Sequence, residues 1–121
     1  MVVPSLFAPD LNGTLAFFVD VLGFDQTGIY PDTDNPIWAE VTFRASGRGS
    51  KIWFFSQPIA DRPAPAMSGV IYIFVDDVDA FCQSLADKVS FRWGPETMDY
   101  GLREVGIEDP NGYLLAFAQD A

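Results

Sequence analysis

The chain has 121 residues, 49% hydrophobic and 15% aromatic, a composition that fits one folded domain and excludes a disordered polypeptide. A formal net charge of −10 would repel phosphate backbones, which argues against nucleic acid as a partner. No apolar run reaches the roughly 20 residues of a membrane helix, and the N-terminus lacks the features of a signal peptide. We therefore expect a cytoplasmic protein that makes no membrane contact.

The first half of the chain predicts one strand, one helix and three further strands. Residues 2–8 are typical of a strand, and Asp10 is placed to cap a helix. Apolar residues then recur at helical spacing from Leu15 to Leu22, and Gly23 is a natural stop. Strand-like runs follow at 24–30, 37–44 and 51–56.

A connector over residues 58–68 separates this half from a second one with the same order of elements. Pro58, Pro63 and Pro65 cannot continue a strand ladder, so this segment predicts a link between structured parts. After it, residues 69–75 predict a strand, and Asp77 is placed to cap a second helix. Three more strands are expected at 91–93, 102–107 and 113–118.

The two halves are similar enough to predict an internal repeat. A shift of 67 residues places Phe7 on Phe74 and Asp10 on Asp77, and a shift of 62 places Phe55 on Phe117. We therefore expect an α+β fold in a single domain, with two βαβββ modules over about 1–57 and 69–121. The modules would form a curved mixed-sheet cleft with helices on the outer faces, and such a cleft is where a ligand would bind.

The sequence near the C-terminus contains a turn and two charged residues that are candidates for chemistry. Asp109-Pro110-Asn111-Gly112 is typical of a tight turn between the last two strands. Arg103 and Glu104 are neighbours in a predicted strand and therefore point to opposite faces. An ion pair at the surface or at a subunit boundary explains these two residues better than general acid-base catalysis.

Cys82 is the single cysteine, and the chain contains no histidine. It cannot form an intramolecular disulfide, and its position on an apolar helix face predicts a small core residue. A nucleophilic role is disfavoured because the usual histidine base is absent from the sequence.

The opening stretch "PSLFAPDLNGTLAFFVDVLGF" and the closing stretch "YGLREVGIEDPNGYLLAFAQ" together resemble the vicinal oxygen chelate superfamily. This superfamily includes glyoxalases, extradiol dioxygenases, fosfomycin resistance enzymes and bleomycin resistance proteins. The chain is most similar to the bleomycin resistance branch, which shares the Arg-Glu and Asp-Pro-x-Gly ending. The resemblance covers the whole chain and implies the two-module fold and a small-molecule ligand.

Catalytic members of this superfamily hold a divalent metal in four symmetric slots on the cleft face. The resemblance places Val3, Val70, Ala116 and Phe54 in these slots, and none of these side chains can bind a metal. Zinc, iron and nickel sites of this kind favour imidazole, which this chain lacks. A magnesium or calcium site made of oxygen ligands stays open, although the acidic runs at 32–34 and 76–79 fit a turn and a helix cap better.

The same slots predict which aromatic side chains line the cleft. If the slots face the cleft, strand alternation adds Ser5, Phe7, Tyr72 and Phe74 to it and places Phe55 and Phe117 beneath the helices. Trp38, Trp93 and Tyr100 would add flat walls. Glu40 would either offer an anion to a cationic guest or be a solvated charge at the edge of the sheet. The predicted ligand-binding residues are Phe7, Trp38, Glu40, Phe54, Tyr72, Phe74, Trp93 and Tyr100.

Three functions remain open from the sequence. The first is a homodimer, without cofactor or metal, that binds a small cationic or aromatic molecule and sequesters a drug as bleomycin resistance proteins do. The second is a glyoxalase-like lyase or a dioxygenase with an atypical metal site. The third is a noncatalytic scaffold whose cleft is filled by its own side chains. Metal-dependent stabilisation and ligand screening would separate them.

Overall fold

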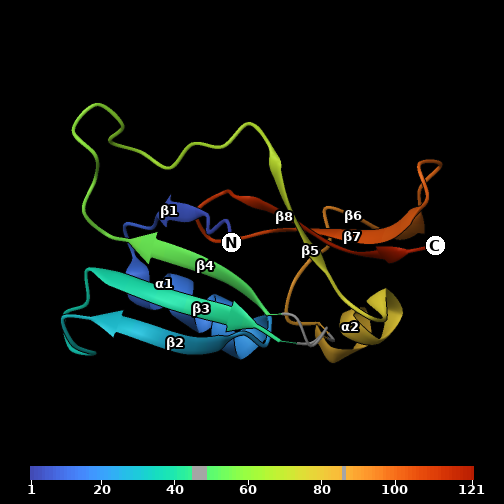
Figure 1. Cartoon of the computed structure of the whole chain (residues 1–121), viewed down its shortest axis with the longest axis horizontal. Coiled ribbons are helices and arrows are strands. Elements are labelled where there is room, and N and C mark those ends of the chain that lie inside the picture. The colour runs from blue at the N-terminus through green and yellow to red at the C-terminus, as the bar shows by residue number, and fades with distance from the viewer. Residues whose placement is uncertain (45–48, 86) are drawn as a thin grey trace.

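The computed structural model describes residues 1–44, 49–85 and 87–121, and these build two repeated modules (Figure 1). The first module contains β1 (Ser5–Phe7), α1 (Leu11–Ala16), the π-helical segment η1 (Phe17–Val21), β2 (Asp25–Tyr30), β3 (Trp38–Phe43) and β4 (Ser50–Phe55). The second contains β5 (Val70–Phe74), α2 (Val78–Leu85), β6 (Trp93–Thr97), β7 (Leu102–Glu108) and β8 (Leu114–Asp120).

Each module forms one mixed four-stranded sheet. The strand orders are β1-β4-β3-β2 and β5-β8-β7-β6, with β1 parallel to β4, β5 parallel to β8, and the other pairs antiparallel. The α+β class and the two βαβββ modules expected from the sequence are confirmed.

The helices begin where the sequence predicts them to begin. Asp10 caps α1 by accepting a hydrogen bond from the backbone N–H of Gly13 at 3.0 Å, and Asp77 accepts one from Ala80 at 3.0 Å before α2. These side chains satisfy backbone donors that have no partner inside the helix. The first helix continues as η1 and ends before Gly23, whose φ of 83° favours glycine.

The position of β6 differs from the prediction. The sequence predicted a strand at 91–93, but β6 runs from Trp93 to Thr97 and contains Gly94 and Pro95. The register between β6 and β7 shifts between Trp93 and Glu96. Proline lacks a backbone donor and is tolerated at such an irregular edge strand, so Gly94 and Pro95 lie within β6.

The closing turn forms as expected and connects the two modules. The backbone N–H of Gly112 donates to the carbonyl of Asp109 at 3.1 Å, which closes the turn between β7 and β8. Asn111 Nδ2 donates to Thr14 Oγ1 of the first module at 3.1 Å, and the Tyr113 hydroxyl donates to the carbonyl of Phe7 at 2.7 Å.

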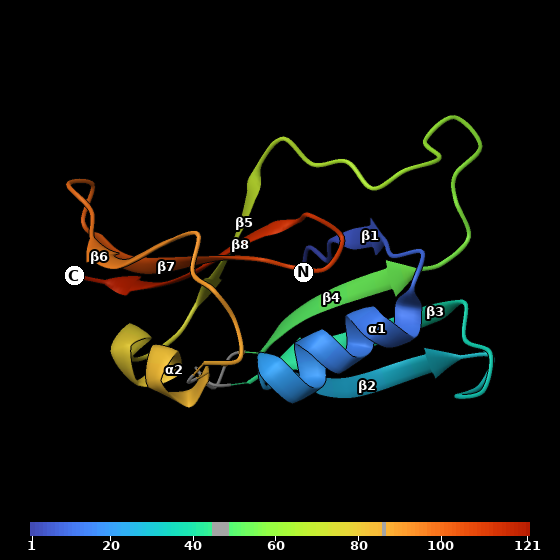
Figure 2. The same ribbon diagram turned by 180° about the vertical axis from the view of Figure 1, so that it is seen from behind.

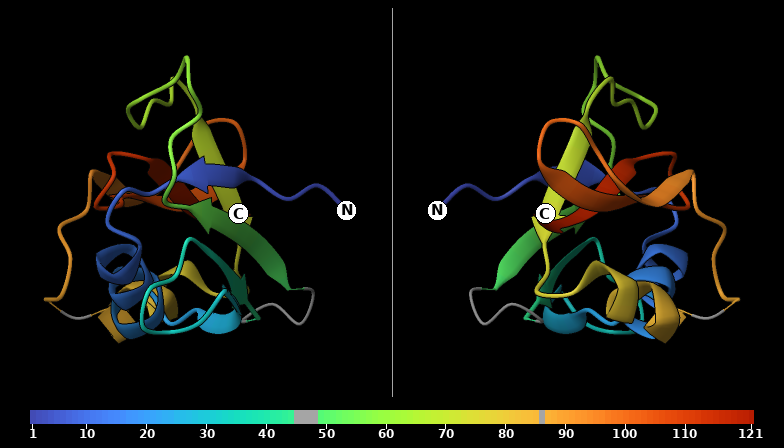
Figure 3. Two further views of the ribbon diagram at one scale, coloured as in Figure 1. Left: turned by 90° about the vertical axis from the view of Figure 1, so that its left-hand side faces the viewer. Right: turned by 90° about the vertical axis from the view of Figure 1, so that its right-hand side faces the viewer.

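The helix-bearing faces of the two sheets meet in one hydrophobic core. In the cartoon, α1 lies behind β3 in Figure 1 and in front of it in Figure 2, and both helices lie on the same side of the second sheet in Figure 3. Phe43 at the end of β3 joins the modules, because its ring centroid lies 5.8 Å from that of Phe81 and 5.7 Å from that of Phe117. The opposite faces of the sheets therefore lie on the outside of this core.

The connector between β4 and β5 arches away from the sheets (Figure 1). It reverses direction where the N–H of Arg62 donates to the carbonyl of Ile59 at 2.8 Å. In the described part of the chain, no helix is both long and apolar enough to cross a membrane.

Candidate functional site

We call the side of each sheet that faces away from its helix the helix-free face. In the first module, strand alternation divides β4 into core residues, such as Ile52, and residues of the helix-free face, such as Trp53. The helix-free face of this module comprises Ser5, Phe7, Trp38, Glu40, Thr42, Lys51, Trp53 and Phe55, which are paired in register across β1, β4 and β3.

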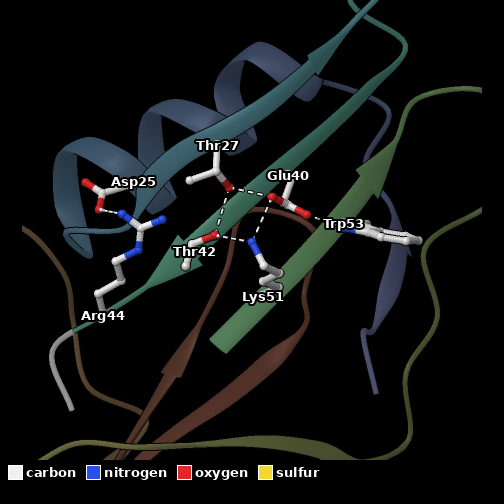
Figure 4. Close-up of polar contacts among 7 residues, drawn as sticks. All are labelled: Asp25, Thr27, Glu40, Thr42, Arg44, Lys51 and Trp53. Carbon is white, nitrogen blue, oxygen red and sulfur yellow. Dashed lines mark hydrogen bonds and ion pairs between the residues drawn. The ribbon is translucent and has the colours of Figure 1, made fainter. Parts of the chain in front are cut away.

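Glu40 is the centre of a polar cluster on this face. Its Oε1 accepts hydrogen bonds from the Thr27 hydroxyl at 2.7 Å and from Lys51 Nζ at 3.0 Å, and its Oε2 accepts one from Trp53 Nε1 at 2.8 Å (Figure 4). The bond from Trp53, followed by those from Thr27 and Lys51, lowers the pKa of Glu40 from 4.5 to about 2. Glu40 is therefore ionised at neutral pH, and Lys51 compensates its charge.

The predicted position of Phe54 was wrong. Phe54 is fully buried, with its ring centroid 4.9 Å from that of Phe18 in η1. The residues on the helix-free face are its neighbours Trp53 and Phe55. Trp53 pairs with Ser5 as Ala116 pairs with Tyr72, so the repeat offset in this strand is 63 and not 62. A register error of one residue moves a side chain to the opposite face.

Phe55 was also predicted on the wrong face, and its true position creates an apolar wall. Its ring stacks on Phe7, with centroids 5.7 Å apart and planes inclined by 25°. A cavity of about 390 Å³ lies between this pair, Tyr113 and the connector residues from Ile59 to Ala66. The cavity has the size of a small organic guest. The prediction for Phe117 is confirmed, since its ring lies 4.3 Å from that of Phe81 in α2.

The second module has its own acid-centred cluster, around Glu104 on β7. Glu104 is 1% exposed. Its Oε2 accepts from Trp93 Nε1 at 2.8 Å and from the Tyr72 hydroxyl at 3.1 Å, and its Oε1 accepts from the Tyr100 hydroxyl. The structure thus brings together three of the predicted ligand-binding residues around a carboxylate that sequence reasoning had assigned to a surface ion pair. Its neighbour Arg103 does form one, with Asp79 at 2.7 Å.

The aromatic side chains around Glu104 remain accessible. Tyr72, Phe74 and Tyr100 are 42%, 48% and 58% exposed, values that are high for large apolar groups. The hydrogen bond to Glu104 raises the pKa of the Tyr100 hydroxyl above its usual range, as does its contact with Tyr72. The phenol therefore stays protonated at neutral pH.

A glycine lies under one indole in each module. A Cβ on Gly106, which pairs with Trp93 across β6 and β7, would collide with the Trp93 ring. A Cβ on Gly28 in β2 would come within 3.0 Å of the Trp38 ring. Because both glycines lack a side chain, each indole lies close against the sheet. Such rings suit stacking against a planar guest.

The metal slots implied by the sequence resemblance do not fit a metal ion. Val70 and Ala116 lie on β5 and β8, Val3 precedes β1, and the fourth position is occupied by Trp53 once the register is corrected. None of these side chains offers a donor that a transition metal prefers. Across residues 1–44, 49–85 and 87–121, no three His, Cys, Asp or Glu side chains are grouped so as to hold a metal.

The family model for the Glyoxalase/Bleomycin resistance protein/Dioxygenase superfamily matches residues 2–117. The chain belongs to this superfamily. No curated protein sequence matches the chain at a significant level.

Several proteins with solved structures share the fold. TnmS3, an antibiotic binding protein from Streptomyces sp. CB03234, is 24% identical, with a TM-score of 0.77 over 98% of this chain and 93% of that one. TioX from Micromonospora sp. ML1 is 18% identical, with a TM-score of 0.77 over 100% and 96%. A lactoylglutathione lyase from Agrobacterium tumefaciens is 22% identical, with a TM-score of 0.70 over 98% and 91%. At these identities the superfamily likeness concerns the fold alone.

The site residues that sequence reasoning missed are Lys51, Trp53, Phe55 and Glu104. The first three follow the alternation of β4. The available sequence signal was the polar Lys51, which shares a face with Thr42 and Glu40 and so shows which residues of β4 face away from the helix. No sequence signal distinguished a buried Glu104 from a surface one, because its burial depends on Tyr72, Trp93 and Tyr100 from three other segments.

Proposed function

We propose that this protein binds a small aromatic or cationic molecule between helix-free faces, without a metal ion, and sequesters it without altering it. The observation that carries the proposal is the replacement of the metal slots by hydrocarbon and indole side chains, on faces that present aromatic rings. The antibiotic binding relative supports the proposal by analogy of scaffold. The setting would be the cytoplasm and the biological role drug resistance.

We further propose that the binding species is a homodimer. Exposed apolar groups, including Trp53 at 37% and Val70 at 38%, lie on the helix-free faces. These faces lie outside the shared core, so a second copy would be needed to cover them and to complete a cleft. Burial of such apolar surface favours association.

The binding proposal is tested by calorimetric titration with two probes, bleomycin and a neutral naphthalenediol, at low and high salt. We expect micromolar binding of at least one probe. Trp53→Ala should weaken it about 5- to 10-fold, because one stacked ring contributes on the order of 1 kcal/mol. Phe91→Ala is the control, since Phe91 packs against the core. Absence of heat with both probes at both salt concentrations would refute the proposal.

A thermal shift assay with zinc, nickel, manganese and iron distinguishes the proposed binding protein from a metal-dependent enzyme. A ligand that binds only the native state raises the melting temperature. We expect no change with any of the four metals, because the slots hold no suitable donors. A rise with one of them would support a metal-dependent enzyme instead.

A further inference from the structure

We propose that the Glu104 cluster is a recognition site for an organic cation of low charge density, such as a quaternary or aromatic ammonium group, read through the rings that enclose the carboxylate. This inference rests on the proposed ligand-binding function and specifies which module holds the cationic end of the guest. Tyr72, Trp93, Tyr100 and Glu96 complete the site.

The first argument is the uncompensated charge. Both oxygens of Glu104 accept hydrogen bonds, an arrangement that suits an ionised carboxylate, and all of its donors are neutral. Within the described ranges, every ion pair of a Lys or Arg side chain is made with another acid, and none reaches Glu104. The negative charge therefore remains available to a guest. Glu40 in the first module differs, because Lys51 lies 3.0 Å from it.

The second argument concerns access. Glu104 is 1% exposed and enclosed by the Trp93, Tyr72 and Tyr100 donors, so a guest cannot touch the carboxylate unless the phenols are displaced. A hard metal ion would require such direct contact. An organic cation requires only contact with the rings of Tyr72 and Tyr100, residues that are 42% and 58% exposed and whose π systems attract a cation in addition to the carboxylate beneath them.

The third argument is a second carboxylate at the same place. Glu96 on β6 pairs directly with Glu104 on β7, so the two side chains share the helix-free face. Glu96 is exposed. The site therefore combines a buried charge with an accessible one, and within the described residues no Lys or Arg side chain forms an ion pair with Glu96 or Glu104.

The test compares two probes of the same shape, phenyltrimethylammonium and neutral tert-butylbenzene, by NMR titration of the full-length protein. We expect the cation to bind about 10-fold more tightly than its neutral isostere and to shift the Trp93 indole N–H signal. Glu104→Gln should reduce this preference to about 2- to 3-fold, the part that Glu96 and the aromatic rings still supply. Asp20→Asn, which removes an exposed charge from η1, is the control and should leave it unchanged.

Glu96→Gln gives a second readout if Glu104→Gln does not fold. Because Glu96 is exposed, its removal should leave the fold intact and reduce the preference for the cation roughly 2- to 5-fold. Equal binding of the two probes would overturn the cation site, and so would an unchanged preference for the cation in both Glu96→Gln and a folded Glu104→Gln. Binding of naphthalenediol would still support the general binding function in either case. If phenyltrimethylammonium, tert-butylbenzene and naphthalenediol all fail to bind, both the cation site and the proposed binding function would be overturned.

Discussion

At the scale of single residues, Glu40 and Glu104 show how one side-chain type acquires two electrostatic roles. Each accepts an indole N–H at 2.8 Å, from Trp53 and Trp93 respectively. Glu40 also has a lysine beside it and a lowered pKa, whereas Glu104 is enclosed by phenols. The two helix-free faces therefore present different charges to a guest, although the modules that carry them are repeats.

The low pKa of Glu40 predicts an acid dependence of stability. Because the folded pKa of about 2 lies below the ordinary value of 4.5, the unfolded chain binds more protons between these values. The stabilisation from Glu40 is thus fully present above pH 4.5 and is lost as the pH falls towards 2. The free energy of unfolding, measured by urea denaturation at several pH values in this range, should therefore depend less steeply on pH for Glu40→Gln than for the wild type.

At neutral pH, Glu40→Gln should also lower the free energy of unfolding by about 1 kcal/mol, because charge-assisted hydrogen bonds become neutral ones. Asp20→Asn removes an exposed carboxylate and serves as the control. We expect its free energy of unfolding to depend on pH as that of the wild type does. A Glu40→Gln protein with the wild-type pH dependence would show that the Thr27, Lys51 and Trp53 contacts do not stabilise the ionised form.

At the scale of elements, strand phase decides which side chains reach a ligand. The alternation of β3 placed Trp38 and Glu40 on the same face, as the sequence indicates, and the turn at Asp109–Gly112 follows directly from its residue types. In β4, both alternate sets contain aromatic residues, so polarity did not define the inner face and an offset of one residue exchanged Phe54 with Trp53. The burial of Glu104 could not be predicted because it is a tertiary effect.

The pairing of β6 with β7 predicts the effect of a single methyl group. Gly106→Ala places a Cβ inside the space of the Trp93 ring, which must move and lose its hydrogen bond to Glu104. We expect a loss of about 1–3 kcal/mol in the free energy of unfolding, measured by urea denaturation followed by circular dichroism. Gly69→Ala is the matched control, since its Cβ would meet nothing within 4 Å. Equal stability of the two variants would contradict the close packing of the Trp93 ring over Gly106.

At the scale of the whole molecule, the shared core determines what the chain can do alone. Phe43 contacts rings of both modules, and the helix-free faces are left outside. The sequence predicted the repeat and its element order because hydrophobic periodicity is local. It placed the helices on outer faces around a cleft, whereas in this chain the helix-bearing faces meet in the shared core, which depends on contacts between segments far apart in the chain. The division into a single domain of two modules with a connector stays a prediction.

The exposed faces predict a concentration-dependent assembly. Sedimentation equilibrium should show a dimer for the wild type, and Phe74→Glu should shift it towards monomer because a charge enters an apolar, 48% exposed position. Ile59→Glu, at a 52% exposed position on the connector, tests whether any added acid has this effect, and we expect it to remain dimeric. A monomeric wild type at all concentrations would contradict the proposed homodimer.

The distribution of aromatic residues also determines which part of the protein its tryptophan fluorescence reports on. All three tryptophans, Trp38, Trp53 and Trp93, lie on the helix-free faces, whereas the fully buried rings of the core are phenylalanines. Intrinsic fluorescence excited at the red edge of absorption therefore originates only at the surfaces where a guest would arrive. Quenching on addition of a compound would report occupancy directly, while rearrangement of the interior would pass unseen.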